Sequence, residues 1–169
     1  MKSGQSNLFF NKITVSEAIE ISGWTYPAPY ELYNGDSSQE TIEEILHTNY
    51  YSARNTDNNL VGYVCFGEGA RVPGGYNAGI YSDTEIIDLG LGLKPELTGE
   101  GYGILLVKDA VKFLQKTENP SIVQLAVAVF NERAIKVYTR AGFKHEEQFV
   151  SAVKGENVEF LSMRLKLRS

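Results

Sequence analysis

The sequence predicts an α/β (α+β) fold in which a mixed central sheet of six or seven strands carries helices on both faces. The predicted elements run strand, two helices, three strands, helix, strand, helix and two strands, so the middle of the chain alternates strand and helix as parallel pairing requires. Residues 122–129 are almost wholly apolar, which is typical of a strand covered on both faces. The chain has 169 residues, enough for one well-packed domain, which we expect over 1–169.

The N-terminal half of the chain carries two helix-start patterns and a hairpin signal. A Ser or Thr followed three residues later by Glu is a capping box, because each side chain can bond a free amide at the helix start. This pattern occurs at Thr14-Val15-Ser16-Glu17 and at Ser37-Ser38-Gln39-Glu40. The elements expected here are a strand over 8–13, a helix ended by Gly23, a short helix through Ile42, Ile45 and Leu46, hairpin strands over 50–55 and 60–66, a glycine-rich loop over 67–79 and a strand over 86–93.

The C-terminal half alternates helices and strands with clear boundaries. Residues 102–116 repeat apolar side chains at helical spacing, and Asn119-Pro120 ends that helix. After the apolar strand a second helix is expected from Asn131 to Ala141. Two last strands, roughly 144–153 and 157–167, flank a hairpin turn at Lys154-Gly155-Glu156.

Between the two N-terminal helices lies a segment rich in aromatic residues. Pro27 and Pro29 stand two residues apart and exclude an ordinary helix, so this segment is expected to be a loop. Aromatic side chains on a loop either anchor it to the core or line a pocket, and both interpretations stay open. The candidates for substrate binding are Trp24, Tyr26, Tyr30 and Tyr33.

Composition and charge exclude several classes of partner. The formal net charge of −5 argues against nucleic acid or an anionic membrane surface. The single cysteine, Cys65, lies in an apolar run and is expected to be buried in a strand, and His47 and His145 have no ligand-like neighbours, so no metal site is expected. The start, Met1 to Gln5, is polar and no apolar run is long enough to span a membrane, so we expect a cytoplasmic protein.

The clearest chemical feature is a glycine-rich connection from a strand to a helix, Thr98-Gly99-Glu100-Gly101-Tyr102-Gly103. Glycines let a ligand approach the backbone, and the first turn of a helix offers unpaired N–H donors, so the segment is typical of an anion site. A nucleoside-triphosphate loop would end in Gly-Lys-Ser/Thr, but Ile104 and Leu105 follow here. A dinucleotide fingerprint would have Gly-x-Gly-x-x-Gly directly after the strand, but the last spacing differs and Pro95 intervenes.

The same segment resembles the coenzyme A motif, Gln/Arg-x-x-Gly-x-Gly/Ala, of the Gcn5-related N-acetyltransferase (GNAT) superfamily. A second block, Asn131-Glu132-Arg133-Ala134-Ile135-Lys136-Val137-Tyr138-Thr139-Arg140-Ala141-Gly142-Phe143, resembles the later motif of that family, in which Asn, Ala, Tyr and Gly-Phe follow at fixed spacing. The resemblance covers roughly residues 60–150 and implies a GNAT-like acyl-CoA N-acyltransferase fold. The sequence departs from the family pattern at Thr98, where Gln or Arg is usual, and at Glu100, which is often basic.

The resemblance also implies which residues hold acetyl-CoA and act on it. Backbone N–H groups of the glycine loop would bind the diphosphate, and strand backbone at about Leu91 to Leu93 would pair with the pantetheine arm and polarise the thioester. Tyr138 matches the family tyrosine beside the sulfur, a general acid that protonates the departing thiolate, although a purely structural place in the apolar stripe of the helix stays open. The implied cofactor-binding set is Leu91, Gly92, Leu93, Thr98, Gly99, Glu100, Gly101, Tyr102, Gly103, Asn131, Arg133, Ala134 and Tyr138.

The first candidate for the general base is Asp88, which has two interpretations, while Asp83, Glu85 and a water chain to bulk solvent also stay open. By strand alternation Asp88 shares a face with Gly90 and Gly92, and two glycines beside a carboxylate predict an open face where an amine could approach. A structural hydrogen bond to loop N–H groups is the competing interpretation. The fifth-strand position that carries a catalytic Glu in some relatives corresponds to Ala126.

These features predict an N-acetyltransferase that moves an acetyl group from acetyl-CoA to a primary amine by direct attack in a ternary complex. The alternatives are a non-catalytic acyl-CoA-binding regulatory module of the same fold and an unrelated nucleotide-binding protein. The acceptor, a small-molecule or peptide amine, stays open among polyamines, aminoglycosides, amino acids and protein N-termini, and a homodimer is possible. The acceptor site is expected between the loops over 24–33 and 67–79 and the last hairpin.

Overall fold

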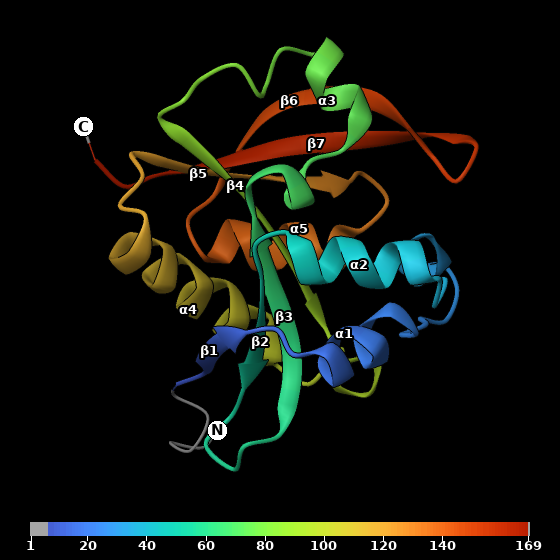
Figure 1. Cartoon of the computed structure of the whole chain (residues 1–169). Coiled ribbons are helices and arrows are strands. Elements are labelled where there is room, and N and C mark those ends of the chain that lie inside the picture. Colours follow the sequence, from blue (N-terminus) through green and yellow to red (C-terminus); the bar gives the residue numbers. More distant parts are fainter. Residues whose placement is uncertain (1–6, 169) are drawn as a thin grey trace.

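The computed structural model describes residues 7–168, which build one seven-stranded sheet with helices on both faces (Figure 1). The polar start of the chain, residues 1–6, and residue 169 lie outside the described residues. The strand order is β1-β2-β3-β4-β5-β7-β6, and only β4 and β5 are parallel, so the predicted mixed sheet is confirmed. The strands are β1 (Phe9–Lys12), β2 (Tyr50–Arg54), β3 (Leu60–Phe66), β4 (Ile86–Leu93), β5 (Ile122–Ala128), β6 (Lys144–Val153) and β7 (Glu156–Lys166).

Two layers of helix enclose the sheet. On one face α4 and α5 cover the main core, in which Leu106 and Val107 pack with strand residues such as Leu89. On the other face α1 and α2 cover a second cluster that contains Trp24 and Ile45. No helix within residues 7–168 is long and apolar enough to cross a membrane. The helices are α1 (Val15–Ser22), α2 (Gln39–His47), α3 (Pro73–Asn77), α4 (Tyr102–Thr117) and α5 (Glu132–Arg140), with short 3₁₀ turns at Glu31–Tyr33, Gly67–Ala70 and Pro95–Leu97.

The two predicted helix starts differ in outcome. Thr14 caps α1 in a complete capping box with Glu17, as predicted. The cap of α2 is Ser38, whose Oγ accepts from the Thr41 amide at 3.1 Å, so the predicted box beginning at Ser37 is wrong by one residue. Ser37 has a φ of 56°, which is incompatible with the extended backbone of a helix cap.

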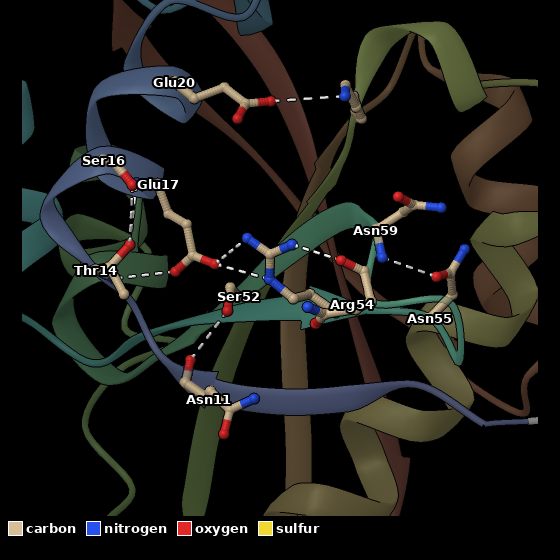
Figure 2. Close-up of polar contacts among 11 residues, drawn as sticks. Asn11, Thr14, Ser16, Glu17, Glu20, Ser52, Arg54, Asn55 and Asn59 are labelled. Atoms are coloured by element: carbon tan, nitrogen blue, oxygen red, sulfur yellow. Dashed lines mark hydrogen bonds and ion pairs between the residues drawn. The ribbon is translucent and has the colours of Figure 1, made fainter.

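An ion pair ties α1 to the sheet, as Figure 2 shows. The Arg54 guanidinium on β2 donates to Glu17 Oε2 from Nη2 at 2.7 Å and from Nε at 3.0 Å. Burial by itself would raise the pKa of Glu17, but hydrogen bonds from Thr14 and Arg54 outweigh it, and the pKa is lowered. A second pair on the same helix, Glu20 with Lys94 at 3.7 Å, reaches the residue that follows β4. Helix α1 therefore contacts both β2 and the end of β4.

The glycine-rich segment predicted as a loop over 67–79 contains a 3₁₀ turn and the short helix α3, which lies beside β6 (Figure 1). Its glycines serve close packing. A Cβ on Gly74 would collide with the carbonyl oxygen of Val150, and one on Gly75 would collide with the Tyr81 ring. The Gly74 amide donates to Ser151 Oγ at 2.8 Å, which fixes α3 against β6.

Candidate active site

Strands β4 and β5 diverge partway along their length and leave a gap at the carboxyl end of the sheet. Their parallel pairing is limited to three rungs and ends at Asp88 with Gln124. Beyond this point β4 continues to Leu93, paired only with β3, while β5 continues to Ala128, paired only with β7. The gap therefore exposes backbone edges of both strands toward each other.

A buried polar network lies where the two strands part. Asp88 is only 3% exposed, and its two oxygens accept from Gln124 Nε2 and from Arg71 Nε, each at 2.8 Å. Gln124 Oε1 in turn accepts from Arg164 Nε on β7 at 2.8 Å. Burial raises the pKa of Asp88, and the hydrogen bonds from Gln124 and Arg71 offset only part of that rise. The network links β4, β5, β7 and the segment that precedes α3.

The face shared by Asp88 and the strand glycines is closed, so the predicted open approach for an amine is wrong. A Cβ on Gly92 would lie 2.5 Å from Cε2 of Tyr63, and one on Gly90 would lie 2.8 Å from Cys65 Sγ. The glycines therefore make room for side chains of β3. Cys65 is buried as expected, and burial raises the pKa of its thiol to about 12, which leaves it unreactive near neutral pH.

The backbone of β4 presents alternate residues to the gap. Lys94 N donates to Val61 O at 2.9 Å, and in an antiparallel pair every second residue bonds the partner strand. Gly92 consequently directs its N–H and C=O toward β3, whereas Leu91 and Leu93 direct theirs toward the gap. The Leu93 carbonyl accepts from the Tyr26 hydroxyl at 2.7 Å. The Leu91 N–H and C=O and the Leu93 N–H remain directed toward the gap.

The glycine loop continues from this strand into α4. Gly99 and Gly101 adopt φ values of 80° and 88°, in the left-handed region that favours glycine, and a Cβ on either would meet no atom within 4 Å. The loop is held internally, because Thr98 Oγ1 donates to Pro95 O at 2.9 Å and Glu100 N donates to Leu97 O at 3.3 Å. Within residues 7–168 no side chain caps the start of α4. Its first-turn N–H groups are therefore available to an anion.

The start of α5 faces the same end of the sheet. Asn131 is its N-cap: Oδ1 accepts from Ala134 N at 3.2 Å, while Nδ2 donates to the Tyr33 hydroxyl at 3.2 Å. Arg133 places its guanidinium 4.5 Å from the centre of the Tyr30 ring. The helix packs closely on the start of α4, since a Cβ on Gly103 would lie 3.6 Å from Val137.

Tyr138 lies two turns into α5, with its ring 6.1 Å from that of Phe143. Burial raises the pKa of its phenol, and the neighbouring Tyr33 phenol raises it further. The hydroxyl therefore keeps its proton at neutral pH and can act as a donor. Tyr138 also raises the pKa of Tyr63 on β3, after larger effects of burial and of Cys65 and Tyr26. These couplings place Tyr138 close to both β3 and the aromatic loop.

The aromatic loop over residues 24–33 spans the gap. Trp24 is buried and packs on Tyr63 with ring centres 6.2 Å apart, so it anchors the loop. Tyr26 is bonded to the end of β4, and burial, with a smaller effect of Glu96, raises its pKa to about 12. Tyr30 and Tyr33 reach the other side, with rings 6.3 and 6.2 Å from that of Phe130 after β5. The same loop thus contacts the ends of both diverging strands.

An open groove of about 640 Å³ lies between this loop, the end of β5 and the β6–β7 hairpin. The loop over 67–79 does not contribute to its lining, so two of the three segments expected around the acceptor meet here. No cluster of three His, Cys, Asp or Glu that could hold a metal ion occurs in the described part of the chain. The groove is lined by Pro29, Glu31, Leu32, Val129, Phe130, Val153, Lys154, Glu156, Asn157, Val158 and Glu159.

Sequence reasoning missed the partners of Asp88 and the role of Phe130. One signal was present: Gln124 is the single strongly polar residue in an apolar strand, and a buried polar side chain must have partners. Arg71 and Arg164 gave no comparable signal, because an isolated arginine in a loop or at a strand end is usually solvated.

Comparisons with known proteins agree with the family resemblance of the sequence. A family model described as acetyltransferase (GNAT) family matches residues 16–143. No curated protein sequence matches significantly. A chimera of the spermidine N-acetyltransferase SpeG from Vibrio cholerae and hSSAT is 20% identical, with a TM-score of 0.71 over 95% of this chain and 96% of that one.

Two further solved structures share the fold. SpeG from Vibrio cholerae in complex with manganese ions is 20% identical, with a TM-score of 0.69 over 97% of this chain and 95% of that one. An acetyltransferase (GNAT family) from Bacillus anthracis is 14% identical, with a TM-score of 0.72 over 94% of each chain. The similar structures show the GNAT fold, and the family match spans most of the chain. This chain therefore belongs to the GNAT family of acetyltransferase enzymes.

Proposed function

We propose that this chain transfers an acetyl group from acetyl-CoA to a primary amine by direct attack in a ternary complex. The observation that carries the proposal is the free edge of β4 beyond its last rung with β5, and the uncapped start of α4 and a phenol that keeps its proton support it. Family membership supports acetyl-CoA as the donor. When bound, it supplies the acetyl group as an activated thioester.

The glycine loop fits a diphosphate through its backbone. N–H groups of Gly99, Gly101 and the first turn of α4 would donate to the diphosphate, and a Cβ on either glycine would enter open space. Side-chain charge contributes less, because the Thr98 hydroxyl is bonded inside the loop and Glu100 is acidic and exposed. We assign recognition of the diphosphate mainly to backbone N–H groups.

The second part of the binding site is formed by β4 and α5. Gap-facing backbone of Leu91 and Leu93 would pair with the pantetheine arm, and an N–H there would polarise the thioester carbonyl. The backbone of Gly92 is directed toward β3, so its contribution is to let Tyr63 pack behind the strand. The Ala134 amide is bonded by the Asn131 cap, which fixes the start of α5 beside the site.

Tyr138 is assigned the role of general acid. The neutral amine attacks the thioester carbon, a C–N bond forms and the C–S bond breaks. The departing thiolate takes the Tyr138 phenolic proton, and the amine nitrogen loses a proton to a base or to solvent. A phenol whose pKa is raised stays protonated in the resting enzyme, as this role requires.

The role of Asp88 as general base stays a prediction. Both of its oxygens accept strong hydrogen bonds, from Arg71 and Gln124, and the residue is only 3% exposed rather than on an open face. This arrangement favours the structural interpretation, in which Asp88 holds the two strands at their point of divergence. Variants of Asp88 and Arg71 separate the two roles.

A panel of amines tests the proposed function. Amines of different class are incubated with the chain and acetyl-CoA, with thiol release followed by absorbance and acetylated products by mass spectrometry. Transfer to at least one primary amine, dependent on acetyl-CoA, is expected. Tight coenzyme A binding with no turnover of any amine would favour the regulatory module, and protection against heat by ATP or NAD with coenzyme A inert would overturn the proposal.

A further inference from the structure

Resting on the proposed function, we infer that the groove between the aromatic loop and the β6–β7 hairpin selects an acceptor that carries a second positive charge, namely an extended aliphatic amine with another ammonium along its chain. The groove supplies apolar contact for the methylene chain through Leu32, Phe130 and Val158. Its acidic residues supply the complementary charge for the distal ammonium.

The groove begins beside the proposed chemistry. Phe130 lines it, and the Phe130 ring lies 6.2 Å from that of Tyr33. The Tyr33 hydroxyl accepts from Asn131 at the start of α5, and its phenol raises the pKa of Tyr138 in addition to burial. An acceptor lying in the groove can therefore direct one end past Tyr33 toward Tyr138 while its other end stays near the hairpin.

The charges of the groove favour a cation. Three of its lining residues are acidic, Glu31, Glu156 and Glu159, and one is basic, Lys154. The Lys154 ammonium is already bonded, because Nζ donates to Asn34 O at 2.8 Å and so links the hairpin to the aromatic loop. The groove consequently retains an excess of negative charge.

The length of the groove favours an extended molecule. Pairing of β5 with β7 ends at Ala128 with Phe160, and one further bond runs from Val129 N to Glu159 O at 2.9 Å. From Glu159 to Glu156 the strand advances about 10 Å with no β5 neighbour. A linear diamine can lie along this stretch with its distal ammonium near the hairpin, whereas a compact amine would not reach the hairpin.

The test compares two acceptors of equal length that differ only in the distal group, 1,5-diaminopentane and 5-amino-1-pentanol. The diamine is expected to have a kcat/KM roughly tenfold higher, as two or three exposed ion pairs would give. The preference should shrink as ionic strength rises, because the carboxylates are accessible to salt.

Variants that remove charge without changing side-chain size test which carboxylates cause the preference for the diamine. Glu156→Gln and Glu159→Gln together should reduce the diamine preference to within about threefold, because kcat/KM for the diamine should fall more than kcat/KM for the amino alcohol. Glu118→Gln is the matched control, because Glu118 follows α4 and does not line the groove, and it should keep the full preference.

The outcomes separate this inference from the proposed function. Turnover of both acceptors with equal kcat/KM would overturn the inference and leave the acetyltransferase proposal intact. A diamine preference that survives the double variant would also overturn the inference, since other residues would then recognise the distal ammonium. Preference for a short peptide with an uncharged side chain over the diamine would assign the groove to a peptide instead. Failure to acetylate any amine would instead count against the proposed function.

Discussion

Asp88 and Gln124 form the last rung shared by β4 and β5, and their side chains are joined by a hydrogen bond of 2.8 Å. The strands separate immediately beyond this rung, so the bond lies at the apex of the gap. Arg71 and Arg164 extend it to the segment before α3 and to β7. The angle at which the sheet opens is thus held by side chains as well as by backbone, and this angle determines the width available to a thioester.

The first prediction separates the two roles of Asp88. Asp88→Asn and Arg71→Met each break the ion pair between these two residues. Arg71→Met also leaves a buried carboxylate without its cation, so the free energy of unfolding should fall by about 3 kcal/mol. If the pair only holds the strands, both variants lower kcat/KM and the pH profile keeps its shape. If Asp88 is the base, its deprotonated form is the active one and activity rises with pH through its raised pKa. Only Asp88→Asn would then remove this rise in activity with pH, as stopped-time assays over a pH series would show.

The second prediction concerns the glycine loop. Gly101→Val should reduce coenzyme A affinity by more than about tenfold, because the side chain would enter the space that a diphosphate needs and would strain a φ of 88°. Gly155→Val is a matched control with a φ of 82° and no atom within 4 Å of its Cβ, at the turn between β6 and β7. Calorimetry should show comparable destabilisation of both variants but lost affinity only at Gly101. Equal coenzyme A affinity in the two variants would refute the loop assignment.

The third prediction is a split between rate and binding at Tyr138. Tyr138→Phe should lower kcat roughly 100-fold, as expected for loss of a general acid, while KM for acetyl-CoA changes by less than about threefold. The packing of the ring on Phe143 is retained in this variant, so folding should be unaffected. Steady-state kinetics with a fixed amine provide the measurement. Parallel losses in kcat and affinity would assign Tyr138 to packing.

The fourth prediction follows from the direction of the Tyr138 pKa. If Tyr138 is the general acid, its protonated phenol is the active form. Because its pKa is raised above the usual value near 10, activity should then persist through pH 10 and fall only at higher pH. The descending limb should be absent from the residual activity of Tyr138→Phe. Activity of the native chain could instead fall well below pH 10, and the same fall could remain in Tyr138→Phe. That result would exclude this tyrosine as the source of the descending limb.

The fifth prediction concerns stability in acid. The pKa of Glu17 is lowered in the folded chain, so its contribution is present above the unfolded value near 4.5 and is lost as pH falls through the folded value. Glu17→Gln should cost about 1–3 kcal/mol at neutral pH and reduce the loss of stability on acidification below the unfolded value near 4.5. Glu20→Gln, on the same helix, removes an exposed pair of 3.7 Å and should cost less than about 1 kcal/mol. Urea unfolding at several pH values compares them, and equal costs would contradict a special role for Glu17.

Much of the architecture could be predicted because periodicity and turn residues are local signals. The apolar strand β5 and the helical stripe of α4 were identified correctly, and the turn at Lys154 and Gly155 has the two positive φ values that a tight hairpin demands. The start of α2 was misplaced because Ser37 and Ser38 are chemically equivalent in the sequence and differ only in backbone conformation.

The site was less accessible to prediction, because its decisive contacts join distant parts of the chain. Gly90 and Gly92 suggest open space in a single strand, but the neighbouring strand fills that space with Cys65 and Tyr63. Likewise, the sequence around Asp88 does not indicate its partners, and Arg164 is linked to it across 76 positions through Gln124. Alternation within a strand predicts the face of a side chain and carries no information about what covers that face.

The aromatic loop contacts both β4 and the β5–α5 connection, and this arrangement bears on how the acceptor range could change during evolution. The loop that would recognise the acceptor is bonded through Tyr26 to Leu93, whose strand would hold the thioester. A mutation that reshapes the loop to admit another amine would also displace that strand edge. Changes of acceptor should therefore show epistasis with positions along β4, and laboratory selection for a new amine should recover paired mutations in the two segments.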